Sequence, residues 1–274
     1  MWFTKTNRKS RKMKLYQIDS FTKEKFKGNP AAVCIVEKAL TEQQMQLLAM
    51  EMNLSETAYV RIGEDHCDLR WFTPAAEVPL CGHATLATAY VLFEEGYWSK
   101  EKVIQFNTLS GPLYVSYVDG MLSMDFPANK PQAKPEMVDE MNSLFGVNLE
   151  QVLTVPGEMI FVFKSEEALL DFDPEEQKVA KLAKNGLITS AKSESANFNF
   201  VSRYFAPNLG IKEDPVTGFM HTILTPYWAE VLDKSKFNAR QASARGGQMQ
   251  TELIGDRVVL KGHAVSVFQT EIAI

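Results

Sequence analysis

The sequence predicts an α+β protein made of two copies of one folding unit, because several short segments recur in order along the chain. Arg-Trp-Phe-Thr-Pro at residues 70–74 is followed 133 residues later by Arg-Tyr-Phe-Ala-Pro at 203–207, and Cys81-Gly82 is followed 136 residues later by Thr217-Gly218. Three more pairs keep nearly the same spacing: Thr41 with Asp173, Gly111 with Gly246, and Gly120 with Gly255. This constant order indicates an internal duplication with a domain-sized period.

Chain length and composition fit two domains. A chain of 274 residues with 45% hydrophobic and 23% charged residues is typical of a globular protein of this organisation. We expect an N-terminal half over 13–130 and a C-terminal half over 131–274, with the alternative that the last strand returns to the first half. Residues 1–12 are basic but lack the apolar core of a signal peptide, so we expect a disordered extension there rather than a nucleic-acid-binding arm.

Charge and cysteine usage narrow the kinds of partner. A net charge of −5 gives no electrostatic reason to expect nucleic acid or an anionic membrane. No apolar run approaches the length of a membrane-spanning helix. The three cysteines form no CxxC pair and are too few for a disulfide framework, which favours a reducing cytoplasm.

The first half is expected to alternate strands with two helices. Thr41 precedes Glu-Gln-Gln and is a predicted helix N-cap, whereas Asp119-Gly120 predicts a hairpin turn. The second helix is expected to begin at Gly82 and to stop at Gly96. The expected ranges are strands 13–19, 31–36, 54–60, a strand that begins at 69, strands 103–107, 113–118 and 121–126, and helices 41–52 and 82–93.

The second half is expected to repeat this order after a linker at 128–135, which contains two prolines. Asp173 is expected to cap a helix that starts at Pro174. Pro226 lacks a backbone N–H, so it is expected to break the last helix near Thr225. The expected ranges are strands 159–163, 186–190 and 198–205, helices 174–184 and 219–232, a hairpin of 248–254 and 257–261, and a final strand 264–274.

Two glycines open the paired helices. A helix that begins at Gly82 or Gly218 presents unpaired backbone N–H groups and the positive end of its dipole. Such an end can hold a carboxylate or phosphate without a charged side chain. We expect both helix starts to face one shared cleft between the halves.

Glu56 is the strongest candidate for a reactive group. It stands among small polar residues at a strand start, and its counterpart by spacing is Ile188 or Thr189, neither of which ionises. An acid that occurs in only one copy, near the paired helix starts, can serve as a general base, and an apolar cleft would raise its pKa. The alternative is an ordinary exposed glutamate at the end of a strand.

Asp214 and His83 are candidates for contacting a substrate. Asp214 precedes Pro215 and either caps the turn into the helix or orients a substrate amine or hydroxyl, and both roles stay open. His83 lies in the first turn of its helix, where the dipole lowers its pKa. A neutral imidazole there can polarise a substrate, or it can simply close the cleft.

Cys81 raises the alternative of a two-base racemase or epimerase. Enzymes of that kind use one cysteine from each half, but the corresponding residue here is Thr217 and no cysteine follows Cys81. We therefore expect Cys81 to pack beside the site. A metal site is not expected either, because Cys81-x-His83 lacks further ligands at a recognisable spacing.

The whole chain from Met13 resembles the PhzF family of isomerases. The residues that carry the resemblance are Gly28-Asn29-Pro30-Ala31-Ala32-Val33, Ser55-Glu56-Thr57, Phe-Thr-Pro-Ala-Ala-Glu-Val-Pro-Leu-Cys-Gly-His-Ala-Thr at 72–85, Glu213-Asp214-Pro215-Val216-Thr217-Gly218, and Gln-x-Ser-x-Arg-Gly-Gly at 241–247.

The resemblance implies the diaminopimelate-epimerase-like fold: two pseudo-equivalent halves, each a curled, mostly antiparallel sheet around a central helix. It implies a site between the halves, no cofactor, and commonly a homodimer. In the phenazine enzyme the matching glutamate moves a proton between carbons of a cyclic dihydro-hydroxyanthranilate. Carried over, Glu56 is the acid/base and His83 and Asp214 contact the substrate. Ser55, Gly82 and Gly218 would line the pocket.

One position departs from the family pattern. Phe219-Met220 stands where the family usually has Ser-Ala, so the pocket is expected to be smaller or more apolar, with the phenazine intermediate disfavoured as substrate. We expect a cofactor-independent isomerase that moves a proton between carbons of a small carboxylate-bearing substrate. The rivals are a non-catalytic small-molecule binding protein on the same fold, which a blocking Phe219 would favour, and a two-base epimerase, which Thr217 disfavours.

Overall fold

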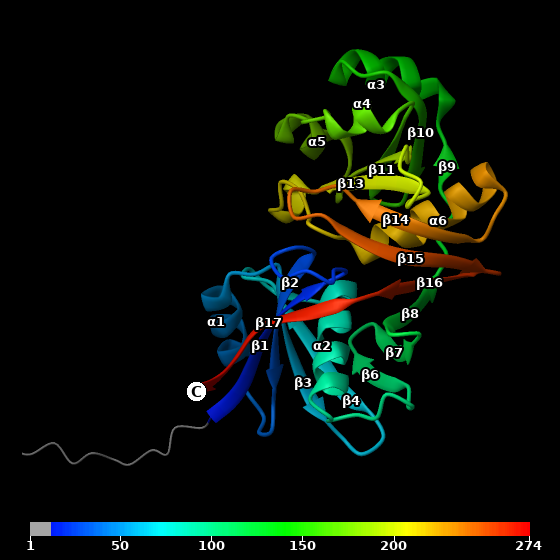
Figure 1. Ribbon diagram of the computed structural model, residues 1–274. Coiled ribbons are helices and arrows are strands. Elements are labelled where there is room, and N and C mark those ends of the chain that lie inside the picture. Colours follow the sequence, from blue (N-terminus) through cyan, green and yellow to red (C-terminus); the bar gives the residue numbers. More distant parts are fainter. Residues whose placement is uncertain (1–11) are drawn as a thin grey trace, which may run out of the picture.

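The computed structural model describes residues 12–274 as one continuous, curled sheet with helices inside and outside it (Figure 1). The predicted basic extension lies almost wholly outside the described residues. Within 12–274, no helix combines the length and apolar character needed to cross a bilayer.

The first half places one helix inside its curled sheet and one outside. Helix α2 lies against strands from several directions, and ten of its residues are buried, whereas α1 covers the other face (Figure 1). The strands are β1 Lys12–Ser20, β2 Asn29–Ile35, β3 Glu56–Ile62, β4 Cys67–Phe72, β5 Glu77–Val78, β6 Ile104–Thr108, β7 Gly111–Val118 and β8 Met121–Pro127, and the helices are α1 Glu42–Met52 and α2 Gly82–Glu94.

The second half has α6 as its inner helix and α3, α4 and α5 outside (Figure 1). Its strands are β9 Gln132–Ala133, β10 Leu149–Val155, β11 Glu158–Phe163, β12 Gly186–Lys192, β13 Phe200–Phe205, β14 Lys236–Gln241, β15 Gly247–Ile254, β16 Arg257–Gly262 and β17 Ala264–Ala273. Its helices are η1 Pro135–Met137, α3 Val138–Phe145, α4 Glu166–Leu170, α5 Glu176–Leu182, η2 Pro207–Leu209 and α6 Gly218–Leu232.

Strand pairing follows the same order in both halves. The first half pairs β1–β2 antiparallel, β2–β3 parallel, β3–β4 antiparallel, β4–β6 parallel, and then β6–β7–β8 antiparallel. The strands β10 to β16 repeat this series of directions. Strand β8 pairs with β16, and the final strand β17 pairs with β1 of the first half. Duplication and the boundary at 130/131 stay predictions, which this correspondence supports.

Several local predictions are confirmed by backbone geometry. Thr41 accepts from the backbone N–H of Gln44 in a reciprocal capping box, and α2 begins at Gly82. Asp119 and Gly120 both have positive φ, of 52° and 77°, as a two-residue hairpin turn of type I′ requires. The strand β10 and the helices α3 and α4 were not predicted, and neither was β14.

The predicted break in the last helix is wrong, because α6 continues through Pro226 to Leu232. Proline removes the N–H that would bond to the carbonyl four residues earlier, at Thr222. The backbone N–H of Asn129 donates to that carbonyl at 3.0 Å, so the helix keeps its hydrogen-bond balance. The linker segment thus supplies the hydrogen-bond donor that Pro226 lacks.

The predicted cap at Asp173 is also wrong. Helix α5 starts at Glu176 with Glu175 at the N-cap, and Asp173 instead lies 3.6 Å from Lys212. The pairing of Thr41 with Asp173 therefore drops out of the repeat, while the four other pairs keep their order.

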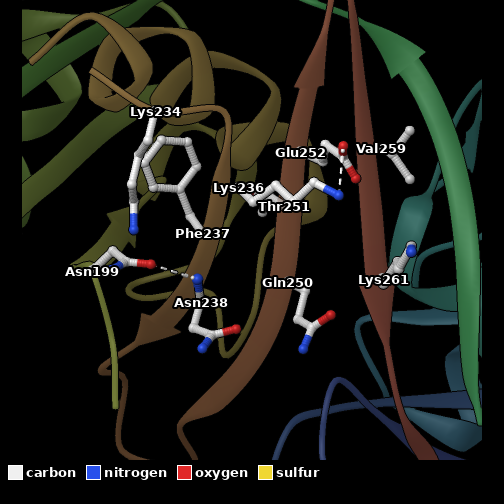
Figure 2. A pocket seen from close by; sticks show the side chains of 10 residues that line it. All are labelled: Asn199, Lys234, Lys236, Phe237, Asn238, Gln250, Thr251, Glu252, Val259 and Lys261. Atoms are coloured by element: carbon white, nitrogen blue, oxygen red, sulfur yellow. Dashed lines mark hydrogen bonds and ion pairs between the residues drawn. The ribbon is translucent and has the colours of Figure 1, made fainter. Parts of the chain in front are cut away.

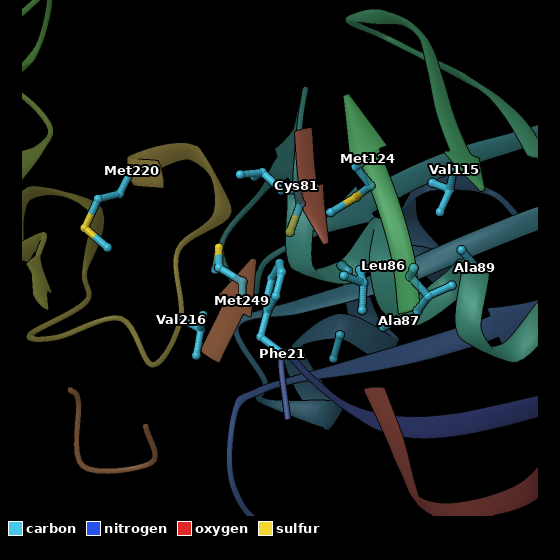
Figure 3. Close-up of a cluster of buried hydrophobic side chains, with 14 of the residues drawn as sticks. Phe21, Cys81, Leu86, Ala87, Ala89, Val115, Met124, Val216, Met220 and Met249 are labelled. Atoms are coloured by element: carbon cyan, nitrogen blue, oxygen red, sulfur yellow. The ribbon is translucent and has the colours of Figure 1, made fainter. Parts of the chain in front are cut away.

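Phe21 holds the two halves together. Its ring is fully buried, and Figure 3 shows it between Val216 and Met249 of the second half and Leu86 of the first. Its backbone N–H donates to His263 O at 2.7 Å, and its carbonyl accepts from Gln248 N at 2.9 Å. A single hydrophobic cluster therefore runs through both halves.

Replacing Phe21 with Ala should cost about 3–5 kcal/mol of unfolding free energy, the usual range for removing a buried phenylalanine. Urea unfolding followed by circular dichroism measures the change. Phe26→Ala is the matched control, because the Phe26 side chain is 70% exposed. Equal stabilities of the two variants would contradict a joining role for Phe21.

Candidate active site

The inner helices α2 and α6 begin close together, at the seam between the halves. Each starts with a glycine, Gly82 or Gly218, and each is preceded by an N-cap residue in extended conformation. A Cβ at Gly82 would meet nothing within 4 Å, and one at Gly218 would touch only Leu260 and Phe21 at ordinary distances. Both helix starts therefore lie where a close approach to the backbone is sterically possible.

Glu56, the first residue of β3, points toward the start of α2. Its carboxylate Oε2 lies 3.1 Å from Nε2 of His83, and its side chain is only 15% exposed. Neither atom has an aligned hydrogen-bond partner within 12–274. Burying two polar atoms without hydrogen-bond partners costs folding free energy unless another group bonds to them. The alternative of an exposed strand-end glutamate is therefore wrong.

Burial raises the pKa of Glu56 to about 7, and the negative charge of Asp214 acts in the same direction. The nearby Cys81 thiol acts in the opposite direction on this pKa. A carboxyl group with this pKa exists in both protonation states near neutral pH, as an acid that must accept and return a proton requires.

His83 is buried and neutral. Desolvation lowers its pKa to about 3, against a smaller opposite effect of a hydrogen bond with the Pro30 backbone. Burial is therefore the leading cause, where the sequence suggested the helix dipole. The Nδ1 atom of the ring lies 3.5 Å from Sγ of Cys81, so His83 stands between the thiol and Glu56.

Asp214 is buried before α6 and held by donors from both halves. Asn29 Nδ2 donates to its Oδ1 at 2.9 Å, and the Thr217 hydroxyl donates to Oδ2. Burial raises its pKa to about 6, while these two hydrogen bonds oppose the change. The negative charge of Asp214 in turn helps to raise the pKa of Glu56. The sequence left two roles open for Asp214. The structure shows the first of them, because the Asp214 side chain holds the turn that leads into α6.

Asn29 and Gln241 belong to this cluster and were missed as site residues. Asn29 Nδ2 also donates to Val216 O at 2.8 Å, and Ser55 Oγ approaches Asn29 Oδ1 at 3.4 Å. Gln241 accepts from Thr217 N at 2.7 Å and donates to Asp214 O at 2.9 Å. Both residues lie in motifs that carry the family resemblance. Their complete burial distinguishes them from ordinary turn residues, which are exposed to solvent.

Comparison with known proteins shows the family to which this chain is similar. Residues 18–270 match the family model described as phenazine biosynthesis-like protein. An uncharacterized isomerase of Halalkalibacterium halodurans is 42% identical, over 94% of this chain and 97% of its own. A crystal structure of a PhzF-family phenazine biosynthesis protein from Enterococcus faecalis has a TM-score of 0.91 and 39% identity, over 96% of this chain and 100% of its own.

The chain belongs to the PhzF family. Its relatives bear the name isomerase, and it is accordingly an isomerase of this family. A hydroxyproline epimerase from Agrobacterium vitis shares the fold alone, with a TM-score of 0.60 and 10% identity over 96% of this chain and 93% of its own. The predicted α+β, diaminopimelate-epimerase-like fold is thereby confirmed.

The counterpart of Glu56 in the second half of this PhzF-family fold is not the residue that sequence spacing predicts. Thr57 pairs with Phe72, and Leu187 pairs with Phe205, so the counterpart of Glu56 in the repeat is Gly186 rather than Ile188 or Thr189. The offset changes because the connection 193–199 is longer than the connection 63–66. Gly186 does not ionise either, so an acid stands at this position in one half alone.

Phe219 lies at the first turn of α6 with 45% of its surface exposed. Whether its ring narrows the substrate pocket stays a prediction, as do the lining roles of Ser55, Gly82 and Gly218. The hollow in Figure 2, of about 400 Å³, lies elsewhere, over β14, β15 and β16. It is lined by lysine and amide side chains and includes neither Glu56 nor Asp214.

Glu56, Cys81 and His83 could together offer a metal three ligand atoms, all within 4.8 Å of one another. In the sequence only Cys81-x-His83 can be recognised as a ligand pair, because Glu56 comes from a separate strand. A metal would require the thiolate of Cys81, but burial and the charge of Glu56 raise the pKa of this thiol well above its usual value. The cluster is better suited to holding protons.

Glu56→Gln should make the protein relatively more stable at alkaline pH. The pKa of Glu56 is about 7 in the folded protein and near 4.5 in the unfolded chain. The contribution of Glu56 to the free energy of unfolding therefore falls as the pH rises between these values. Above pH 7 the wild type bears a buried charge that Gln lacks. The melting temperature of the variant relative to wild type should therefore be higher at pH 8 than at pH 4.5.

Two controls accompany this measurement. Glu158→Gln should show the same trend, because burial also raises the pKa of Glu158 to about 7. Glu64→Gln, at an exposed position, reports the general pH dependence of the protein. A pH-independent difference between Glu56→Gln and wild type would show that Glu56 ionises as freely in the folded as in the unfolded chain.

Proposed function

We propose that this PhzF-family isomerase moves a proton between two carbons of a small carboxylate-bearing substrate, with Glu56 as the general acid/base and without a cofactor. One observation carries the proposal: the Glu56 carboxylate is buried beside neutral His83, with one oxygen left without an aligned partner. The raised pKa of Glu56 supports the same role.

The proposed reaction has two proton transfers. The ionised Glu56 takes a proton from one carbon, and the C–H electron pair is delocalised into the unsaturated system of the substrate. The protonated Glu56 then gives the proton to a second carbon, which restores the carboxylate. Because the glutamate side chain has three rotatable bonds before its carboxyl group, it can reach both carbons without a backbone movement.

The remaining site residues receive supporting roles. His83 would polarise the substrate through Nε2, the atom that faces Glu56. Asp214 would orient an amine or hydroxyl, and the backbone N–H groups that open α2 and α6, with Ser55, would hold the carboxylate. The homodimer and the cytoplasmic location stay predictions that rest on the resemblance and on cysteine usage.

Glu56→Gln should lower turnover by about 10²–10⁴-fold, the usual scale for loss of a general acid or base. Glutamine preserves shape but cannot accept the proton, so ligand affinity should be retained. The substrate is first identified by a thermal-shift screen of small cyclic and amino carboxylates, and exchange of its carbon-bound hydrogen with D₂O is then followed by NMR. Glu158→Gln, a buried acid outside the site, is the matched control. Full activity of Glu56→Gln would refute the mechanism.

The rival function, a non-catalytic small-molecule binding protein, draws on Phe219. A large ring at the start of α6 replaces the small residue that the family usually has, and it could obstruct the substrate. A ligand that stabilises the protein yet shows no hydrogen exchange with the wild-type protein would favour this rival. A two-base epimerase is disfavoured, because the Thr217 hydroxyl donates to Asp214 and is no thiol.

Phe219→Ser should widen the range of carboxylates that stabilise the protein in the thermal-shift screen. The smaller hydroxyl side chain would leave room at the helix start and add a donor. Leu209→Ser, at another exposed apolar position, is the control. An unchanged ligand profile would show that the Phe219 ring points away from the pocket.

A further inference from the structure

Asn29 is a fully buried polar residue that contacts both halves beside the candidate active site. It is the first residue of β2, and its backbone pairs with Ser20 of β1. A side-chain amide in such a place costs folding free energy unless its hydrogens and its oxygen find partners. The partners of Asn29 therefore indicate what its side chain does.

Both hydrogens of the Asn29 amide are donated to the second half. Nδ2 donates to Oδ1 of Asp214 at 2.9 Å and to the carbonyl oxygen of Val216 at 2.8 Å. The amide oxygen Oδ1 accepts from Ser55 Oγ of the first half at 3.4 Å. An ionised carboxylate and a carbonyl can only accept, so a reversed amide would set its oxygen against two acceptors. The partners thus fix which way the amide points.

Asp214 can still accept a further hydrogen bond despite these contacts. Asn29 donates to its Oδ1 and the Thr217 hydroxyl donates to its Oδ2. Each oxygen of a carboxylate can accept about two hydrogen bonds, so neither is saturated. The backbone of Asp214 is fixed as well, because Gln241 Nε2 donates to its carbonyl at 2.9 Å. An acid held in this way has capacity left for an amine or hydroxyl of a substrate.

We propose that Asn29 is a positioning residue for the isomerase reaction, which keeps Asp214 of the second half ionised and correctly oriented at a fixed position relative to Ser55 of the first. The inference rests on the proposed function for its effect on turnover, because it takes Asp214 as the residue that orients the substrate. The hydrogen bonds themselves do not depend on that function. Asn29 acts through Asp214 and is assigned no contact with the substrate.

Charge explains why an amide, and not a carboxylate, suits position 29. Burial raises the pKa of Asp214, and the hydrogen bonds from Thr217 and Asn29 lower it. An aspartate at position 29 would set a second carboxylate against the first, and one of the two would then keep a proton. The other titratable groups whose charge acts on Asp214, or responds to it, are Glu213, Glu56, Cys81 and Tyr204.

The first test is an NMR titration of Asp214 in the full-length protein. Aspartate is labelled with ¹³C at the side-chain carboxyl carbon, and the Asp214 signal is assigned as the one that disappears when Asp214→Asn is added. Asn29→Ala removes one hydrogen bond to the carboxylate and should raise the titration midpoint by about 1–2 pH units. Asn29→Asp should raise the midpoint of the resulting carboxyl pair further, because the pair shares one proton.

Asn185→Ala and Asn185→Asp are the matched controls, because the Asn185 amide donates at 3.1 Å to Glu158, a buried acid outside the site. They should leave the Asp214 midpoint at its wild-type value. An unchanged midpoint in the Asn29 variants would overturn the proposal. Should Asn29→Ala or Asn29→Asp fail to fold, Asn29→Ser is measured against the same criterion. Its shorter side chain has one hydrogen for two acceptors, so an upward shift is expected there too.

Activity then separates a positioning role from a merely structural one. With the substrate identified, Asn29→Ala should lower kcat/KM by about 10²-fold, the scale for misplacing a group that orients a substrate. The acidic limb of the kcat/KM profile should move to higher pH together with the Asp214 midpoint. A lower melting temperature with an unmoved acidic limb would show that Asn29 is structural only and would overturn the proposal.

The outcomes also distinguish this inference from the proposed function. A moved midpoint and acidic limb in a protein whose Glu56→Gln variant keeps full activity would uphold the role of Asn29 and refute the proton-transfer mechanism. An unmoved midpoint together with a large loss of turnover in Glu56→Gln would uphold the mechanism and remove Asn29 from it.

Discussion

The side-chain amide of Asn29 joins the two halves at the point where their inner helices begin. It comes from the first half, donates to Asp214 Oδ1 and Val216 O of the second, and approaches Ser55 beside Glu56 through its oxygen. All of this takes place at a fully buried position. A buried carboxylate is costly without donors, so the burial of Asp214 depends on Asn29, and the nearby charge that bears on Glu56 depends on Asp214.

Hydrogen bonds between the halves fix the position of the chain directly before Asn29. Arg245 lies 2.8 Å from the buried Asp19 carboxylate and also donates to the carbonyls of Gly28 and Lys27, directly before Asn29. Gly28 N donates to Gly246 O at 2.7 Å. Gly28 has φ of 65°, and a Cβ there would lie 2.1 Å from Ser20 O, so this close approach requires glycine. The glycine-rich turn at 241–247 thus forms one side of the contact between the halves that positions the site.

The sequence could predict the features that depend on neighbouring residues. The capping box at Thr41, the hairpin at Asp119-Gly120 and the start of α2 at Gly82 each have a local cause, and each is present. The break at Pro226 could not be judged locally, because the compensating donor is Asn129, far away in sequence. Strand β14 was missed for a similar reason: its polar composition hides an alternation that only its place between β13 and β15 explains.

Prediction of the site had the same limit. Glu56 and His83 could be identified as candidates from residue type and family resemblance, yet their 3.1 Å approach depends on β3 and α2 meeting in space. Asn29 and Gln241 were not predicted as site residues, because their hydrogen-bond partners lie in the other half or across a loop. A polar residue inside a turn motif gives no local sign that it is buried.

The second half contains a buried acid of its own, and its surroundings explain why it is a poor candidate for catalysis. Glu158 is buried and has a raised pKa, as Glu56 has. However, the Tyr204 hydroxyl lies within 3.3 Å of both of its oxygens, and Asn185 donates to it as well. The Tyr204 ring also fills the space that a side chain at Gly186, the counterpart of Glu56, would need. An acid whose oxygens are all engaged is held as a structural group, whereas the partnerless oxygen of Glu56 can still accept a proton. Burial alone therefore does not identify the base, and the distribution of donors does.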